Sequence, residues 1–307
     1  MARIDHTDLD VLPLCLGGNI FGWTADEPES FAVLDAYAGA GGNFIDTADS
    51  YSAWAPGNQG GESEHVIGNW MAERGNRDEV VLATKVGSIG GLSAANVRDR
   101  VEASLRRLQT DHIDLLYAHK DDPDTPFEET LTAFGELIAG GKVRYIAASN
   151  LKADRLAQAL AVSDREGLPR YVALQPHYNL VERERYEGEL ESLCEREGLA
   201  CVPYYGLAKG FLSGKYRSGG PDPETHRGSL SGTAYLENPR ALGVLERLDQ
   251  IAADHGVPVA AVALAWLAAQ PTVVAPIASA RNPEQLAELL ASVSLDLSED
   301  ELARLSS

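Results

Sequence analysis

Eight short apolar runs recur along the chain, and each is followed by a stretch with helical spacing. The runs cover residues 12–18, 43–46, 79–85, 113–119, 143–150, 171–176, 200–205 and 272–277. The stretch "SAANVRDRVEASLRRL" (93–108) illustrates the helical half of the unit, with Val97, Val101 and Leu105 on one face and Ser93 as the N-cap. The order of elements is therefore a strand followed by a helix, eight times over.

Continuous apolar strands are typical of a parallel sheet that is buried on both faces. Eight strand–helix units without a signal for an edge strand predict a closed (β/α)8 TIM barrel. The main alternative is a doubly wound sheet, which favours a G-x-G-x-x-G turn directly after a strand. The nearest candidate, "AGAGGNF" (38–44), precedes a strand instead, so we favour the barrel.

The connection between the seventh and eighth strands is unusually long. It contains a Gly/Ser-rich loop and helical stretches at 240–254 and 258–269, so we expect an extra helix there and another at the C-terminus. No linker or low-complexity tract interrupts the pattern, and we expect residues 1–307 to form one barrel domain.

The charge of the chain restricts its partners. Lys and Arg total 26 against 46 for Asp and Glu, which gives a formal net charge of −20. Such a field disfavours nucleic acids and anionic membranes, so we expect a small-molecule partner. An anionic ligand would need a local group of cations, for which Lys209, Lys215, Arg217 and Arg281 are candidates.

Processing signals and cysteines indicate a reduced, cytoplasmic protein. The N-terminus is too polar for a signal peptide, and no apolar stretch approaches 18 residues. Cys15, Cys194 and Cys201 are odd in number, without a CxxC spacing, and are expected to be reduced packing residues. An oligomer is compatible with this sequence.

Polar residues stand at the ends of the predicted strands. Asp46 ends the second, Lys85 the third and His119 the fourth, while Tyr51 follows shortly after Asp46. Each has a structural explanation: a turn cap for Asp46, a lysine reaching from a strand end, a packed core histidine. Because the carboxyl ends of barrel strands share one rim, we expect the four side chains to meet there and form a site.

These four residue types suit the protonation of a carbonyl oxygen while a hydride reaches its carbon. A Lys ammonium about 4 Å from a phenol contributes on the order of 4 kcal/mol at an effective dielectric of 20, or roughly three pKa units. We therefore expect Lys85 to lower the pKa of Tyr51 towards neutrality, where general acids work best. Asp46 would hold Lys85, and His119 would orient the substrate oxygen.

Several motifs together resemble the aldo-keto reductase superfamily, whose members are NADPH-dependent (β/α)8 oxidoreductases. The resemblance covers nearly the whole chain. The motifs that carry it are "LGGNIFGW" (16–23), "FIDTADSY" (44–51), "GESEHVIGNWM" (61–71), "VVLATKVG" (80–87), "SLRRLQTDHIDLLYAHKDDPDTPFEETL" (104–131), "GKVRYIAASN" (141–150), "LQPHYNL" (174–180), "GFLSGKY" (210–216) and "PIASARNPEQLAELL" (276–290).

The resemblance implies reduction of aldehydes or ketones, with Asp46, Tyr51, Lys85 and His119 as the catalytic tetrad and NADPH/NADP+ as the cofactor. It places Ser149, Asn150 and Gln175 at the nicotinamide carboxamide, Tyr204 stacked on the ring, the loop from Gly206 to Ser213 at the pyrophosphate, and Arg281 at the 2′-phosphate. The cofactor residues that it implies are Ser149, Asn150, Gln175, Tyr204, Gly206, Leu207, Lys209, Gly210, Ser213, Lys215, Ser279, Arg281, Gln285 and Glu288. A cap for the following helix is the structural alternative for Arg281.

The chain departs from the family pattern in places. Tyr205-Gly206 stands where Ser-Pro is common, and Leu289 where an Asn often contacts adenine. The segment 52–61 is longer than the usual turn. We expect Phe21, Trp23 and Trp54 to line the substrate mouth and to favour flat or apolar carbonyl compounds.

Three other functions fit parts of the pattern. A Schiff-base aldolase would use Lys85 as its nucleophile but leaves Arg281 unexplained. A metal hydrolase with Asp46, His119 and His177 lacks an HxH motif, so we expect no metal. A cofactor-binding subunit that senses redox state without turnover is the third.

Overall fold

The computed structural model describes residues 1–217 and 232–307, and its centre is an eight-stranded parallel sheet in the order β10-β3-β4-β5-β6-β7-β8-β9. The strands are β3 (Cys15–Gly17), β4 (Phe44–Asp46), β5 (Val81–Val86), β6 (Ile113–Ala118), β7 (Val143–Ser149), β8 (Tyr171–Gln175), β9 (Ala200–Cys201) and β10 (Ile277–Ala278). The backbone nitrogens of Cys201 and Ile277 donate to the carbonyls of Thr272 and Pro203 at 2.8 and 2.9 Å. These bonds close the sheet, and the predicted (β/α)8 barrel is confirmed.

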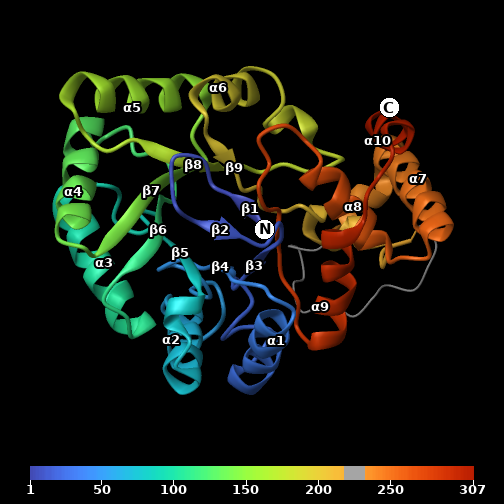
Figure 1. Ribbon diagram of the computed structural model, residues 1–307, viewed down its shortest axis with the longest axis horizontal. Helices are drawn as coiled ribbons and strands as arrows, with labels where there is room; N and C mark the ends of the chain where they lie inside the picture. The colour runs from blue at the N-terminus through green and yellow to red at the C-terminus, as the bar shows by residue number, and fades with distance from the viewer. Residues whose placement is uncertain (218–231) are drawn as a thin grey trace.

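Helices surround the sheet (Figure 1). Those that alternate with strands are α1 (Glu27–Gly39), α2 (Glu62–Arg74), α3 (Ala94–Leu108), α4 (Phe127–Ala139), α5 (Ala153–Glu166), α6 (Glu189–Glu197), α8 (Val259–Ala268) and α9 (Pro283–Leu290). The expected extra helices are α7 (Pro239–His255), between β9 and α8, and α10 (Glu299–Ser306) at the end of the chain. Ser93 caps α3 as predicted, because its side chain accepts a bond from the Asn96 backbone nitrogen.

Four predicted strands were too long, three of them for a shared reason. The runs 12–18, 200–205 and 272–277 contain Pro13, Pro203 and Pro276, and strands β3, β9 and β10 lie beside these prolines rather than across them. Proline has no backbone N–H to donate to a sheet, so it shortens the ladder. In the run 79–85 the start belongs to a 3₁₀ turn, Arg77–Glu79, and β5 begins at Val81.

A small antiparallel hairpin, β1 (Ala2–Arg3) with β2 (Asp10–Val11), precedes the barrel and was not predicted. Its apolar residues Ile4, Leu9 and Val11 are buried and pack with side chains of the barrel interior, such as Phe44 and Leu115. The hairpin crosses the centre of the view in Figure 1. It therefore covers the amino-terminal end of the barrel and leaves the carboxyl end as the place for a site.

Among the described helices, none is by itself long and apolar enough to cross a membrane. Only α7 and α8 taken together reach that length and composition, and they are bent by 101° to each other.

Candidate active site

The four predicted catalytic residues come from one rim of the barrel. Asp46 is the last residue of β4, Lys85 lies one residue before the end of β5, and His119 directly follows β6. Tyr51 lies in the turn that leaves β4. Because β4, β5 and β6 are neighbouring parallel strands, their carboxyl ends bring these side chains towards one another.

Lys85 is the centre of this group. Its Nζ lies 2.5 Å from Asp46 Oδ2, 2.8 Å from the Thr47 carbonyl oxygen and 2.9 Å from the Tyr51 hydroxyl oxygen, and the side chain is 1% exposed. An ammonium group has three N–H donors, which these three oxygens use completely. The Tyr51 oxygen therefore accepts from Lys85, and the Tyr51 hydroxyl donates a long bond of 3.4 Å to Asp46 Oδ2. A substrate oxygen that comes closer than this carboxylate would be a better acceptor for the Tyr51 proton.

The predicted lowering of the Tyr51 pKa is wrong for the protein alone. Burial raises the pKa of Tyr51 well above its ordinary value, and the nearby Asp46 carboxylate raises it further. Burial likewise lowers the pKa of Lys85, against the attraction of Asp46. The Asp46 carboxylate beside Lys85 and the burial of the phenol together oppose the effect of the ammonium on the pKa of Tyr51. At neutral pH the phenol keeps its proton, which is the form that a general acid needs.

His119 is neutral in the same site. Burial, with smaller effects of the Lys85 and Lys120 charges, lowers the pKa of His119 to about 3. Its ring meets the Tyr51 ring edge-on, with centroids 6.1 Å apart. The Nδ1 atom is buried and has no hydrogen-bond partner among residues 1–217 and 232–307. Burial thus leaves a neutral imidazole beside the phenol.

Two acidic residues beneath the rim were not singled out from the sequence. Asp49 is 1% exposed, its carboxylate oxygens have no hydrogen-bond partner in the described part of the chain, and its one ion pair, to Arg100 Nε, is 3.4 Å long. Burial raises the pKa of Asp49 to about 6. Glu64 is better satisfied, because it accepts bonds from Thr84 and Arg107 at 2.6 and 2.7 Å. Only the apolar context of "FIDTADSY" hinted that Asp49 would be buried.

The residues expected at the nicotinamide carboxamide contact one another. Gln175 Nε2 donates to Asp46 Oδ1 at 2.9 Å, which links this group to the tetrad. Ser149 Oγ donates to the Gln175 carbonyl, and Asn150 Nδ2 lies 3.0 Å from Ser149 Oγ. The Tyr204 hydroxyl donates to Asn150 Oδ1 at 2.8 Å. The ends of β7 and β8 and the segment after β9 thus form a continuous polar wall beside Lys85.

The segment after Tyr204 is a kinked 3₁₀ stretch, Ala208–Ser213. Lys209 and Gly210 both have positive φ, of 57° and 90°, which turns the chain sharply. Ser213 Oγ donates to the Gly210 carbonyl oxygen. Gly206 is buried, and a Cβ there would approach a Leu267 methyl group to 3.1 Å. Of the remaining loop residues in the predicted set, Leu207 is half-buried and Lys215 is exposed.

Arg281 precedes α9 and does not cap it. The N-cap is Asn282, whose side chain accepts from the Gln285 backbone nitrogen, and Gln285 Oε1 in turn accepts from the Arg281 backbone nitrogen at 3.1 Å. The Arg281 guanidinium has no ion pair or hydrogen bond to any other described residue. Arg217, by contrast, is paired with Asp249 at 2.6 Å. Among the cations that we considered for an anionic ligand, the Arg281 side chain therefore has no partner within the described residues, whereas Arg217 has one.

The other residues expected near the adenosine part of the cofactor differ in their exposure. Ser279 is half-buried and donates to Asn19 at 2.6 Å, while Glu288 is exposed on α9. Leu289 is buried against the first helix in the same core cluster as Val33 and Leu34. Its side chain is used for packing and does not reach the surface where an adenine would lie.

Comparisons with known proteins agree with the geometry of the site. A model of the aldo/keto reductase family matches residues 13–307. The chain is 34% identical to norsolorinic acid reductase A of Aspergillus parasiticus, over 95% of this chain and 76% of that protein. It is 36% identical to the uncharacterized oxidoreductase YrpG of Bacillus subtilis, over 98% and 93%, and 32% identical to protein tas of Escherichia coli, over 99% and 95%.

The chain belongs to the aldo/keto reductase family. Family membership and the reductase names of its relatives support an oxidoreductase that acts on carbonyl groups of small molecules. No group of three or more His, Cys, Asp or Glu side chains in the described part of this aldo/keto reductase could hold a metal ion.

Of the three aromatic residues expected at a substrate mouth, Phe21 does not fit the expectation. Phe21 is fully buried in the core with Ile67 and Trp70, so its side chain does not line the mouth. Trp54 is 47% exposed, meets Trp23 edge-on at 5.6 Å and lies 6.0 Å from the Tyr51 ring. The sequence does not distinguish Phe21 from Trp23, because nearby residues in one turn can point either into the core or towards the rim.

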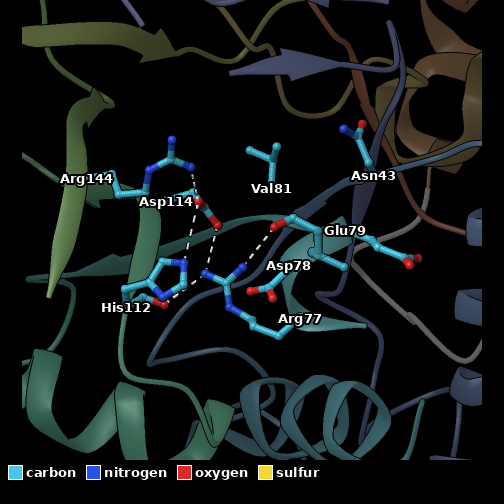
Figure 2. Close-up of a pocket in the computed structure, with 9 residues that line it drawn as sticks. Asn43, Arg77, Asp78, Glu79, Val81, His112, Asp114 and Arg144 are labelled. Atoms are coloured by element: carbon cyan, nitrogen blue, oxygen red, sulfur yellow. Dashed lines mark hydrogen bonds and ion pairs between the residues drawn. The ribbon is translucent and has the colours of Figure 1, made fainter. Parts of the chain in front are cut away.

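A second charged region lies at the opposite end of the barrel. A cavity of about 250 Å³ there is lined by residues that begin the strands, among them Arg77, Asp114 and Arg144. Figure 2 shows the Asp114 carboxylate between the two guanidinium groups, which donate to it at 2.8 and 2.6 Å. The family's chemistry takes place at the carboxyl rim, so we interpret this cavity as a gap in a structural ion-pair network.

Proposed function

We propose that the protein reduces aldehydes or ketones to alcohols with NADPH and that Tyr51 is the general acid. The observation that supports the proposal is the set of three bonds from Lys85, which makes the Tyr51 oxygen an acceptor and leaves its O–H with only a long bond of 3.4 Å to Asp46 among the described residues. The neutral state of Tyr51 fits this role, because a phenolate could not donate.

The residues fit a nicotinamide dinucleotide phosphate. The Arg281 guanidinium is without a partner in the described chain, and a planar fork of donors suits a phosphate dianion. Lys209 forms no ion pair there either and lies 5.8 Å from the Tyr205 ring centroid, at the kinked segment expected near the pyrophosphate. Amide and hydroxyl groups of Ser149, Asn150 and Gln175 suit a carboxamide. When bound, the reduced nicotinamide supplies the hydride.

The chain's own residues would handle the proton. His119, kept neutral by burial, bonds the carbonyl oxygen of the substrate and orients it. Tyr51 donates its proton to that oxygen, and the ammonium of Lys85 stabilises the phenolate that remains. Asp46 and the Thr47 carbonyl hold Lys85 in place throughout. Solvent then returns a proton to Tyr51.

The mouth supports flat or apolar carbonyl compounds. Trp23 and Trp54 offer a broad apolar surface beside Tyr51. One relative is named for the reduction of norsolorinic acid. The two indole rings near Tyr51 make aromatic ketones and aldehydes the first compounds to test.

The test is a panel of aldehydes and ketones incubated with NADPH, with loss of NADPH absorbance and the alcohol product as readouts. We expect turnover for at least one aromatic carbonyl, and a rate for Tyr51→Phe that is lower by roughly 10²-fold or more. NADPH binding without turnover of any compound would overturn the proposal and indicate a redox-sensing subunit. Borohydride trapping of a substrate adduct on Lys85 would instead indicate a Schiff-base aldolase.

A further inference from the structure

The Tyr204 ring has one face occupied within the protein. The His177 ring is stacked on it, with centroids 5.3 Å apart and an interplanar angle of 30°. Tyr205 meets the edges of both rings, at 5.0 Å from Tyr204 and 5.1 Å from His177. Because His177 covers one face, a ligand ring can stack only on the other.

His177 is itself fixed by a bond to a largely buried carboxylate. Its Nε2 lies 2.6 Å from Glu182 Oε2, and both side chains are largely buried, at 12% and 17% exposed. Burial lowers the pKa of His177 below its ordinary value, so a neutral imidazole donates this bond to the carboxylate. Asn179 Oδ1 accepts from the Glu182 backbone nitrogen at 3.1 Å and fixes the start of that turn.

The chain of contacts continues to another element. The Tyr235 hydroxyl donates to Glu182 Oε2 at 2.7 Å, and Arg185 Nε donates to Oε1 at 3.1 Å. Tyr235 belongs to the 3₁₀ stretch Gly232–Glu237, which leads into α7. Three side chains therefore connect the entry to α7 with the ring of Tyr204.

We propose that His177, Glu182 and Tyr235 are positioning residues that set the angle of the Tyr204 ring for stacking on the nicotinamide. The inference rests on the proposed function, since it takes the nicotinamide as the ligand of the free face of Tyr204. The hydroxyl of Tyr204 is already fixed by its bond to Asn150. With the hydroxyl and one face held, the ring has a single orientation before the cofactor binds, which reduces the ordering cost of binding.

The experiment compares NADPH binding by quenching of protein fluorescence in His177→Ala, His177→Phe, Glu182→Gln and Tyr235→Phe. We expect His177→Ala to raise the Kd by roughly 3- to 10-fold, the range of an aromatic pair. His177→Phe keeps a ring on Tyr204 and should recover most of the affinity. Glu182→Gln and Tyr235→Phe keep the fold's shape and should each raise the Kd by roughly twofold.

A second readout separates positioning from folding. The primary deuterium isotope effect on hydride transfer should rise in His177→Ala and return towards the wild-type value in His177→Phe, because a tilted nicotinamide slows that step. The matched control is His255→Ala, which removes an equivalent His–Glu bond, of 2.7 Å to Glu301, far from the site. It should change neither quantity.

The outcomes distinguish this inference from the proposed function. Wild-type affinity and isotope effect in His177→Ala, in a protein that binds and oxidises NADPH, would overturn the positioning role alone. A wild-type protein that fails to bind NADPH would overturn the proposed function and the positioning role together.

Discussion

Each end of the barrel buries a carboxylate beside a cation, but the two carboxylates differ in the groups that they bond. Asp46 at the carboxyl rim and Asp114 at the amino end are both 2% exposed at the side chain. Asp114 accepts from two arginines and from the Leu82 backbone nitrogen at 2.9 Å. Asp46 accepts from Lys85 and Gln175, and its lysine is shared with Tyr51.

The difference is whether each network is complete. At the amino end, the described bonds of Asp114 to Leu82 and Arg144 join β6 to β5 and β7, and a third bond joins it to Arg77 in the turn before β5. At the carboxyl rim, His119 Nδ1 and both oxygens of Asp49 are buried without hydrogen bonds inside the described ranges. Buried polar groups that lack partners are costly. We infer that the amino end is optimised for stability and the carboxyl rim for binding something else.

The largest expected effect at the carboxyl rim comes from Tyr51→Phe. Removing the hydroxyl should lower the rate of carbonyl reduction by roughly 10²- to 10⁴-fold, the usual contribution of a general acid. The Kd for NADPH should stay within about twofold, since the proposed cofactor contacts are untouched. Steady-state kinetics and a binding titration check this. Unchanged turnover would remove the phenol from the mechanism.

At the amino end the corresponding change is Asp114→Ala, which leaves two partly buried arginines without their shared partner. We expect a loss of about 3–5 kcal/mol in the free energy of unfolding, measured by urea denaturation, with kcat unchanged in the protein that remains folded. Asp10→Ala is the matched control, because it breaks an exposed Arg–Asp pair. A stable Asp114→Ala variant with reduced kcat would contradict the assignment of the two ends.

The raised pKa of the buried Asp49 predicts that the stability of the protein depends on pH. Its folded pKa of about 6 lies above the ordinary value of 3.8, so the folded state binds more protons between these values. Stability due to this group should fall as the pH rises from about 4 to about 6, by up to about 1.4 kcal/mol per pH unit. Asp49→Asn should abolish that loss in urea denaturation at each pH.

His119 should change the stability with pH in the opposite direction in the same experiment. Its folded pKa of about 3 lies below the ordinary value of 6.5, so its contribution rises as the pH rises through this window. In Asp49→Asn the net rise of stability with pH should therefore be steeper than in the wild type, because the opposing contribution of Asp49 is removed. A pH profile of stability that is identical in both proteins would show that Asp49 titrates normally.

The smallest expected effect concerns cofactor choice. Arg281→Ala should raise the Kd for NADPH by roughly tenfold or more, the value of a charge-assisted bond, and leave the Kd for NADH nearly unchanged. Arg217→Ala is the matched control, since that arginine is already paired with Asp249. Equal losses for the two cofactors would assign Arg281 a structural role.

Much of the fold could be predicted, because strand–helix alternation is a local pattern. In a closed barrel, the carboxyl ends of all parallel strands then lie at one rim. This brought Asp46, Lys85 and His119 to one rim from sequence positions far apart. The hairpin Ala2–Val11 was missed, since two-residue strands leave no periodicity to detect. That residues 1–307 form one domain stays a prediction.

The electrostatics of the site could be predicted less well. The pKa of Tyr51 depends on burial depth and on how the charge of Lys85 is compensated by Asp46, which are properties of packing. The burial of Phe21 and Asp49 depends on how two turns fold over the rim. The residue types in a site follow from sequence motifs, whereas their proton affinities require the surrounding structure.

The N-terminal hairpin has a practical consequence for handling this protein. Its first eleven residues seal the base of the barrel with Ile4, Leu9 and Val11, and Asp8 adds an ion pair to Arg144. A protease cut within this hairpin, or its deletion, would open the base of the barrel to solvent rather than alter a free tail.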